Sequence, residues 1–422
     1  MSGIIKLKSI EINSKNKIAP FFKTILSIYC YFSLYKNYWD KTMQVIYRTE
    51  DLKALCFRLS QHDFIAVDLE FIREKTYYPI LCLIQVASED EAAIIDPLAP
   101  DLDLSVFFEL MQNTDVTKVF HSCRQDVEII YNMSKHIPQP LFDTQIAAMA
   151  CGFGESISYE RLVKAVLNIE LDKTDCLSNW QLRPLNEHQL EYACGDVTHL
   201  VKLYKYLKQE LEKDNRYEWI KEELDFVSQP STYITDPDEI WHKIKFRSHN
   251  SKVLSNLKAL AAWREKRAQN KDVPRQSIIK DDVLTMIASA SPKSKSDLEK
   301  IRGMRKDVVS GKLADEMLET LSNVKVDTKL SKNANDNINY ISSLVEMLKL
   351  LLRIVSQKHG IVPRLIASET DLQKLSAFQD SNHPVLSGWR YKIFGKSALK
   401  LRSGELAVRY NPKNKNIEFI EQ

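Results

Sequence analysis

The stretch FIAVDLEF, residues 64–71, decides the fold, because it combines the apolar pattern of a buried strand with two carboxylates. Burying one carboxylate is costly, and burying two close together is costlier still unless a cation neutralises them. Asp68 and Glu70 occupy alternate positions, so both side chains leave the same face, roughly 6–7 Å apart at the backbone. The spacing predicts that the two carboxylates converge on one cation. An exposed edge strand with outward polar residues is the alternative interpretation.

Two later segments supply further acidic side chains. In VFHSCRQDVEIIY, residues 119–131, a strand runs into a helix that carries Asp126 near its first turn. The helix dipole favours an acid at that position, so a capping role is the alternative there. In LEYACGDVTHLVKLY, residues 190–204, Tyr192 and Asp196 are four apart and share one face of a long helix. A Tyr–Asp hydrogen bond on the helix surface is the alternative for that pair.

Hydrophobic periodicity around these segments predicts an α/β domain that ends near residue 215. Strands are expected at 64–71, 80–88, 91–97 and 117–122, and helices at 102–112, 124–133, 143–151, 158–167 and 186–214. In the last helix, apolar residues from Leu190 to Leu211 recur at the three–four spacing of a buried face. These elements form a mixed sheet covered by helices.

The rest of the chain predicts helices only. From about residue 240 the strand signals vanish, and all-α C-terminal domains are expected. The expected elements are a helix that ends before Pro274, helices at 280–290, 295–301 and 304–322, a polar linker at 326–337, a helix at 338–359 and a less regular tail to 422.

The charge of the chain is divided between its two halves. Residues 43–240 carry a formal charge of −17, whereas residues 241–330 carry +9 and residues 331–422 carry +6. A basic back half suits a part that holds a polyanion while the acidic front half processes it. Ordinary surface solubility is the alternative explanation.

The N-terminal residues and the cysteines indicate where the first domain begins and in which compartment the protein lies. Residues 1–42 look foreign to the rest, and the domain pattern begins at Met43, so we interpret them as a non-native or disordered extension. Their apolar patch, residues 19–35, is interrupted by Lys23 and too short for a membrane span. The seven cysteines are scattered without zinc-ligand spacing, which indicates reduced thiols in a cytoplasmic protein.

Taken together, the motifs resemble the DEDD family of 3′-to-5′ exonucleases. The order is a D-x-E on the first strand of the set, an Asp after a strand-to-helix turn, and Y-x-x-x-D on a late helix. The tyrosine at 192 marks the tyrosine branch, since the histidine branch would need His at 191, which is Glu. The resemblance implies a ribonuclease H-like mixed sheet flanked by helices.

Flanking segments resemble ribonuclease D in particular. These are FIREKTYYPILCLIQVA at 71–87, LFDTQIAAMACGFG at 141–154 and LDKTDCLSNWQLRPLNEHQLEYACGDV at 171–197. LKALAAWREKRAQNKDVPRQSIIKDDVL and LEKIRGM, within 250–325, resemble the helicase-and-RNase-D C-terminal (HRDC) domain, and 338–422 resembles a divergent second copy. The implied organisation is an exonuclease domain at 43–215, a connector at 216–249, an HRDC domain at 250–325, a linker at 326–337 and an HRDC-like unit at 338–422.

The resemblance also implies roles for the five motif residues. Asp68, Glu70 and Asp196 would ligate one divalent metal, Asp68 would bridge to a second, and Asp126 would support that second site. Hard oxygen ligands suit Mg²⁺ or Mn²⁺. Tyr192 would position the water that attacks the phosphodiester, and nucleoside 5′-monophosphates would leave one at a time from a free 3′ end.

The last of these segments and the remaining motifs predict further residues and partners. Lys173, Trp180 and Arg183 combine positive charge with a stacking surface and are candidates for binding the backbone and bases of a single RNA strand; for Trp180, a partly buried anchor that holds a loop onto the domain is the alternative. No phosphate loop is found, so ATP-driven action is not expected. We expect a monomeric exoribonuclease that trims tRNA precursors and other structured RNAs. A DNA-directed exonuclease and an RNA-binding scaffold with an inactive site are the rivals.

Overall fold

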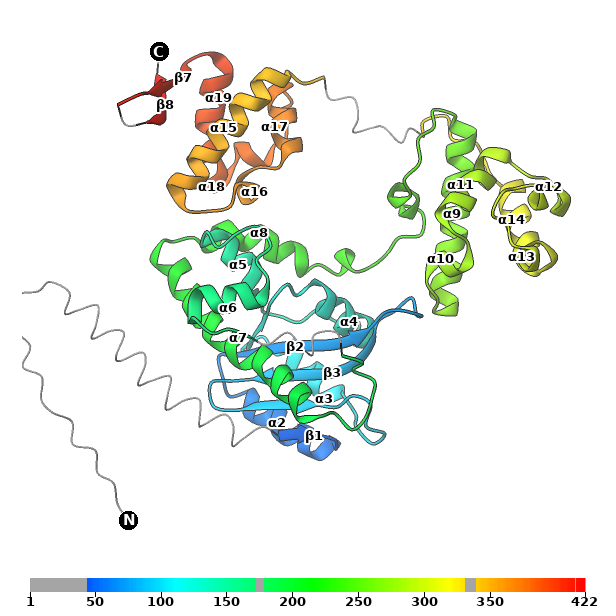
Figure 1. Ribbon diagram of the computed structural model, residues 1–422, viewed down its shortest axis with the longest axis horizontal. Helices are drawn as coiled ribbons and strands as arrows, with labels where there is room; N and C mark the ends of the chain where they lie inside the picture. Colours follow the sequence, from blue (N-terminus) through cyan, green and yellow to red (C-terminus); the bar gives the residue numbers. More distant parts are fainter. Residues whose placement is uncertain (1–43, 172–177, 331–338, 414, 422) are drawn as a thin grey trace, which may run out of the picture.

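The computed structural model describes residues 44–171, 178–330, 339–413 and 415–421. The predicted extension at 1–42, Lys173 and most of the linker at 326–337 lie outside these residues. The described chain forms an α/β domain and two helical units, each with its own hydrophobic core (Figure 1).

The α/β domain is built on a six-stranded mixed sheet. Its strands are β1 (Gln44–Ile46), β2 (Phe64–Ile72), β3 (Ile80–Ala87), β4 (Ala92–Ile95), β5 (Thr117–Phe120) and β6 (Leu141–Asp143), in the spatial order β1-β4-β3-β2-β5-β6. The β2–β3–β4 meander is antiparallel, whereas β1 runs parallel to β4, and β5 runs parallel to β2 and β6. The predicted strands are confirmed. The edge strands β1 and β6 were not predicted, since three residues are too few to show alternation.

Helices flank the sheet, five of them as the periodicity predicted, whereas the helices at 49–59 and 217–227 were not predicted. They are α2 (Thr49–Leu59), α3 (Ser105–Gln112), α4 (Arg124–Ser134), α5 (Thr144–Ala150), α6 (Tyr159–Leu167), α7 (Glu187–Lys213) and α8 (Tyr217–Val227). The long helix α7 begins at a capping box in which Asn186 and Gln189 satisfy each other's backbone N–H groups. It crosses β2, β3 and β4 (Figure 1). This crossing places its polar residues above the strand that carries Asp68 and Glu70.

The first helical unit is all α-helical, as expected, but the helix at 275–278 was not predicted and the one expected at 304–322 is divided at Gly311. Its helices are α9 (Ser251–Lys271), α10 (Arg275–Ile278), α11 (Asp281–Ala290), α12 (Lys295–Glu299), α13 (Lys306–Ser310) and α14 (Lys312–Ser322). A short helix, η2 (Ile240–Lys243), precedes α9 and packs against it. As predicted, α9 ends before Pro274, with Asp272 in the left-handed conformation at its C-terminus.

The second helical unit is mainly α-helical but ends in strands that the pattern did not predict. Its elements are α15 (Ser342–His359), α16 (Pro363–Ile366), α17 (Glu369–Ser376), η3 (Pro384–Leu386), α18 (Gly388–Arg390), a π-helical turn η4 (Tyr391–Gly395), α19 (Lys396–Ser403), β7 (Leu406–Asn411) and β8 (Asn416–Glu421). The strands β7 and β8 form an antiparallel hairpin. The all-α prediction is therefore incomplete for the tail, where a polar turn that includes Pro412 and Lys413 follows β7.

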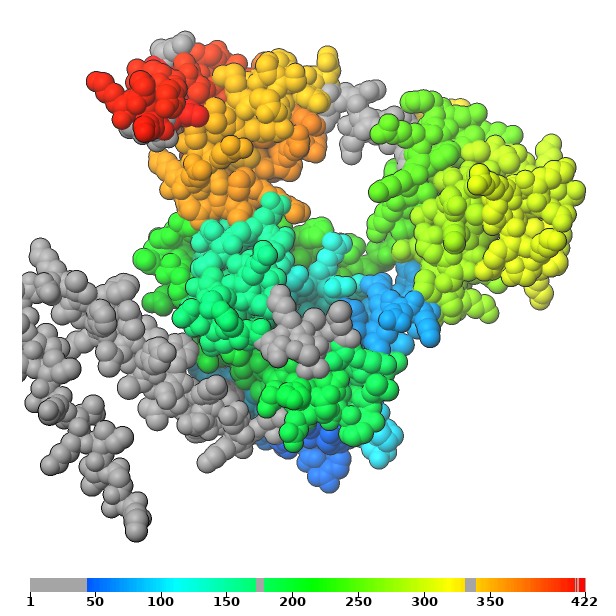
Figure 2. Space-filling model, in the orientation of Figure 1, coloured from blue at the N-terminus to red at the C-terminus, as the bar shows by residue number. Residues whose placement is uncertain are grey.

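The two helical units contact different parts of the α/β domain, with an opening between them (Figure 2). The second unit packs on α5 and α8, where Trp219 stacks on Trp389 with ring centroids 5.0 Å apart. Arg390, which is buried, pairs with Glu222 on α8. The backbone N–H of Val362 donates to the carbonyl of Met149 over 3.2 Å. The second unit is thus fixed to the α/β domain by apolar, charged and main-chain contacts.

Candidate active site

Strand β2 presents two carboxylates to helix α7. Asp68 and Glu70 leave the same face of β2, and Asp196 reaches them from α7. One carboxylate oxygen from each of these three residues can be chosen so that all lie within 4.8 Å of one another. The three side chains are partly buried. The convergence predicted from the D-x-E spacing is therefore present, and it includes the acid of the Y-x-x-x-D motif.

The cluster is electrostatically strained without a cation. Burial raises the pKa of Asp68 to about 7, and burial together with the neighbouring Asp68 raises the pKa of Glu70 to about 9. The pKa of Asp196 is also well above its usual range, because of burial first and then of Asp68 and Glu70. Among the described residues, none of these acids forms a salt bridge. Such a group of hard oxygen donors fits a divalent cation such as Mg²⁺ or Mn²⁺.

Asp126 lies in the first turn of α4 with only 7% of its surface exposed. Its pKa is well above the usual range, because of burial first and then of the charge on Asp68. A backbone hydrogen bond at Asp126 partly offsets this rise, and the place of the acid in the first turn agrees with the helix-dipole alternative as well. Asp126 stands beside the three-acid group without belonging to it.

The turn that positions Asp126 depends on a residue outside the motifs. Ser122 adopts the left-handed conformation, with φ of 61°. Its backbone N–H donates to Oδ1 of Asp143 over 3.0 Å, and that of Cys123 donates to Oδ2 over 2.8 Å. Asp143 also caps α5. The buried carboxylate of Asp143 therefore ties the β5–α4 turn to β6. The position of Asp143 directly before a helix was the sequence signal that could have identified it as a capping residue.

A second tyrosine supports Asp196 through the backbone. The hydroxyl of Tyr159, on α6, donates to the carbonyl oxygens of Gly195, over 3.1 Å, and of Asp196, over 2.5 Å. Sequence reasoning missed this residue, because its partner groups are main-chain atoms of a helix far along the chain.

Tyr192 lies one turn before Asp196, and a hydrogen bond from its side chain opposes the rise in the pKa of Asp196. The indole of Trp180 lies 6.1 Å from the Tyr192 ring between centroids, at an interplanar angle of 34°. Trp180 is only 3% exposed and belongs to a small core cluster beneath α7. Trp180 therefore supports Tyr192 from within the domain, which fits the loop-anchor alternative rather than the RNA-gripping one.

Arg183 is likewise committed to contacts within the protein. Its guanidinium forms a bidentate pair with Asp96, at 2.6 and 2.7 Å, and donates to the carbonyls of Trp180 and Cys82. These hydrogen bonds occupy most of the N–H donors of the Arg183 guanidinium, so few remain to bind a nucleic acid. Lys173, the third residue of that predicted set, lies outside the described residues.

Comparison with known proteins defines the class. Residues 43–212 match the family model described as 3′-5′ exonuclease, and residues 254–321 match the HRDC domain. The chain is thus a 3′–5′ exonuclease domain followed by an HRDC domain, as the sequence predicted.

Relatives then define the family. Ribonuclease D of Bartonella henselae is 40% identical over 373 residues, which cover 87% of this chain and 92% of that protein. Ribonuclease D of Zymomonas mobilis is 44% identical over 377 residues, covering 88% and 97%. The crystal structure of Escherichia coli RNase D, described as an exoribonuclease involved in structured RNA processing, matches with a TM-score of 0.73 at 27% identity, covering 86% and 99%. The chain belongs to the ribonuclease D family of 3′–5′ exoribonucleases.

Every helix within the described part of the chain is too short or too polar to cross a membrane. The expectation that the chain is not a membrane-spanning protein concerned mainly the patch at 19–35, which lies outside that part.

Proposed function

We propose that this exoribonuclease uses Asp68, Glu70, Asp126, Tyr192 and Asp196 to trim the 3′ ends of tRNA precursors and other structured RNAs, releasing nucleoside 5′-monophosphates. The observation that carries the proposal is the convergence of Asp68, Glu70 and Asp196 within 4.8 Å, in a chain whose relatives are ribonucleases D. The tRNA precursor is the substrate that the family resemblance favours.

The carboxylates would hold two divalent cations, Mg²⁺ or Mn²⁺. Asp68, Glu70 and Asp196 fit the first of them, and Asp126 with Asp68 fits the second. When bound, the cations would supply the positive charge that activates water and stabilises the leaving 3′-oxygen. The fit rests on the donor set, since four buried or partly buried carboxylates without salt bridges in the described residues need a compensating charge.

The side chains of the protein have separate tasks in this scheme. Tyr192, held by the indole of Trp180, would orient the attacking water toward the terminal phosphodiester. Tyr159 would fix the backbone at Asp196, and Asp143 would fix the turn that carries Asp126. Positioning of this kind reduces the entropy that must be lost in the transition state.

We also propose that the enzyme acts as a monomer in the cytoplasm. The second helical unit and the first are attached to one α/β domain at separate places, so one chain carries every part that the reaction needs (Figure 2). The cysteines within the described residues are free, which agrees with a reducing compartment.

The test uses a tRNA precursor with a 3′ extension, labelled at its 5′ end, and a DNA of the same sequence. With Mg²⁺ or Mn²⁺, a ladder that shortens from the 3′ end on RNA and stops near the mature end supports the proposal. Degradation of the DNA with equal efficiency would instead support a DNA-directed exonuclease. RNA that shifts on a native gel but stays intact would support a binding scaffold.

A further inference from the structure

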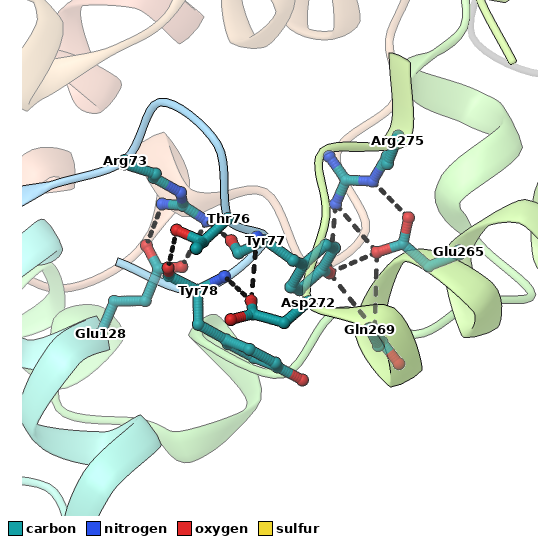
Figure 3. Close-up of polar contacts among 9 residues, drawn as sticks. All are labelled: Arg73, Thr76, Tyr77, Tyr78, Glu128, Glu265, Gln269, Asp272 and Arg275. Carbon is teal, nitrogen blue, oxygen red and sulfur yellow. Dashed lines mark hydrogen bonds and ion pairs between the residues drawn. The ribbon is translucent and has the colours of Figure 1, made fainter. Parts of the chain in front are cut away.

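The loop between β2 and β3, residues 73–79, directly follows the strand that carries Asp68 and Glu70. We call it the β2–β3 loop. It contacts α4 on one side and the first helical unit on the other (Figure 3). These contacts join the active-site strand to a domain nearly two hundred residues further along the chain.

Tyr77 is the centre of the contact with the first helical unit. Its hydroxyl donates to Glu265 on α9, whose side chain is fully buried. Arg275 neutralises that carboxylate and lies over the Tyr77 ring, with its guanidinium carbon 5.3 Å from the centroid. Nη2 of Arg275 is 3.3 Å, and Nε2 of Gln269 is 3.2 Å, from the Tyr77 hydroxyl. Figure 3 shows the ring enclosed by these side chains.

Asp272 adds a second, main-chain contact. Its Oδ1 accepts the backbone N–H groups of both Tyr77 and Tyr78 at 3.0 Å. Asp272 ends α9 in the left-handed conformation, with φ of 49°, which is easier for Asp, Asn and Gly than for other residues. The carboxylate of Asp272 therefore reaches the β2–β3 loop from a fixed position at the end of the helix.

The other side of the loop is tied to the helix that carries Asp126. Arg73 forms a bidentate pair with Glu128 on α4, at 3.0 and 2.9 Å. Its Nη2 also donates to the carbonyl of Tyr77 over 3.3 Å. The β2–β3 loop thus connects α4, β2 and α9, of which the first two carry catalytic acids.

Two grooves meet at this loop. One has a volume of about 490 Å³ and runs from Glu70 along the loop to the segment at 178–181. The other has a volume of about 430 Å³ and lies between the loop and the first helical unit. Both are lined by Arg73, Glu74 and Thr76, so the loop is their common wall.

Each groove presents one lysine to a polyanion, beside the exposed Glu74 that lines both grooves. Lys75 lines the first and Lys243 the second, and both residues are exposed. Neither forms a salt bridge with a described residue. An RNA whose 3′ end lies near Glu70 could continue past the loop to the first helical unit and place its phosphates near these lysines.

We propose that Tyr77 and Asp272 form a latch that docks the first helical unit beside the active site, and that the latch selects RNAs extending from the site across the β2–β3 loop. This rests on the proposed function for its substrate class. Tyr77 and Asp272 are positioning residues, since neither belongs to the cluster of Asp68, Glu70 and Asp196. With the latch released, the unit would remain tethered through residues 228–250 but lose its fixed place.

The test compares the double variant Tyr77→Phe/Asp272→Gly with Asp272→Asn. Glycine removes the acceptor and tolerates the left-handed backbone, whereas asparagine retains both the acceptor and that tolerance, which makes it the matched control. Each full-length protein is examined by small-angle X-ray scattering. Its kcat/KM is then measured on a short single-stranded RNA and on a hairpin RNA with the same 3′ tail.

The double variant is expected to show a larger radius of gyration. Its kcat/KM should fall about tenfold or more on the hairpin RNA and less than about twofold on the short RNA, since only the longer substrate gains from a second, fixed contact. Asp272→Asn should behave as the wild type. An unchanged radius of gyration, equal losses on both RNAs, or undiminished hairpin cleavage by a visibly undocked protein would each overturn the proposal.

The failure of the proposed function is distinguishable from the failure of the latch. A wild-type protein that cuts neither RNA would refute the exoribonuclease and the substrate selection that depends on it. The scattering measurement needs no activity, so it would separately support or refute the docking by Tyr77 and Asp272.

Discussion

Replacing Asp68 with asparagine should make the metal-free protein more stable while destroying its activity. Asp68 is partly buried beside Glu70 and Asp196, and its ionisation opposes folding because the folded state raises its pKa from 3.8 to about 7. At pH 8 the unfolded chain and the folded protein both ionise this group, and the rise corresponds to about 4 kcal/mol of lost stability. Partial exposure of the side chain reduces this by roughly half, to about 2 kcal/mol.

The gain should be visible as a higher melting temperature of the α/β domain. For a domain of this size, about 2 kcal/mol corresponds to a rise of about 4–8 °C. Asp115→Asn, on an exposed residue of the same domain, is the matched control and should leave the melting temperature unchanged. The assay is thermal unfolding at pH 8 with EDTA, followed by circular dichroism.

Adding Mg²⁺ should raise the melting temperature of the wild type above that of Asp68→Asn. The wild type should gain about 2.7 kcal/mol at a Mg²⁺ concentration a hundredfold above its Kd, whereas Asp68→Asn should gain much less. An Asp68→Asn protein that melts at or below the wild-type temperature in EDTA would refute the electrostatic reasoning. A wild-type melting temperature that does not change with Mg²⁺ would also refute it.

Three further outcomes follow from the same site. Without metal, the wild type should lose stability as the pH rises from about 4 to 9, because Glu70 and its neighbours have folded pKa values above their unfolded ones; unfolding curves that are flat with pH would contradict this. Tyr192→Phe should lower kcat by about a hundredfold with little change in the Mg²⁺ concentration needed for half-maximal activity; an unaltered kcat would exclude its role in orienting water. Trp180→Ala should destabilise the domain by about 3–5 kcal/mol, as expected for a buried indole. A variant with normal stability and a raised KM would return Trp180 to the RNA-binding role.

The parts of the site that could be predicted are those set by local periodicity. A separation of two residues on a strand places Asp68 and Glu70 on one face. A separation of four residues on a helix does the same for Tyr192 and Asp196. The strand-to-helix turn similarly fixed the position of Asp126. In each of these cases the separation along the chain determines the separation in space within one element.

The parts that could not be predicted depend on contacts between distant segments. Tyr77 and Glu265 are 188 residues apart, and neither stands out from its neighbours in the sequence. Trp180 belongs to an irregular segment, where no periodicity distinguishes a buried indole from an exposed one. The hairpin at β7 and β8 is short, and its alternation is weak beside the helical signals that precede it.

The central claim is that the carboxylates around Asp68 form a metal-dependent centre that shortens RNA from its 3′ end. Its most direct test is a single-turnover assay on a 5′-labelled RNA with a free 3′-hydroxyl, using the wild type, Asp68→Asn and Asp115→Asn. The account predicts a ladder from the 3′ end for the wild type and Asp115→Asn in Mg²⁺, and intact RNA with EDTA or with Asp68→Asn. Wild-type shortening that persists in EDTA, or an active Asp68→Asn protein, would contradict it.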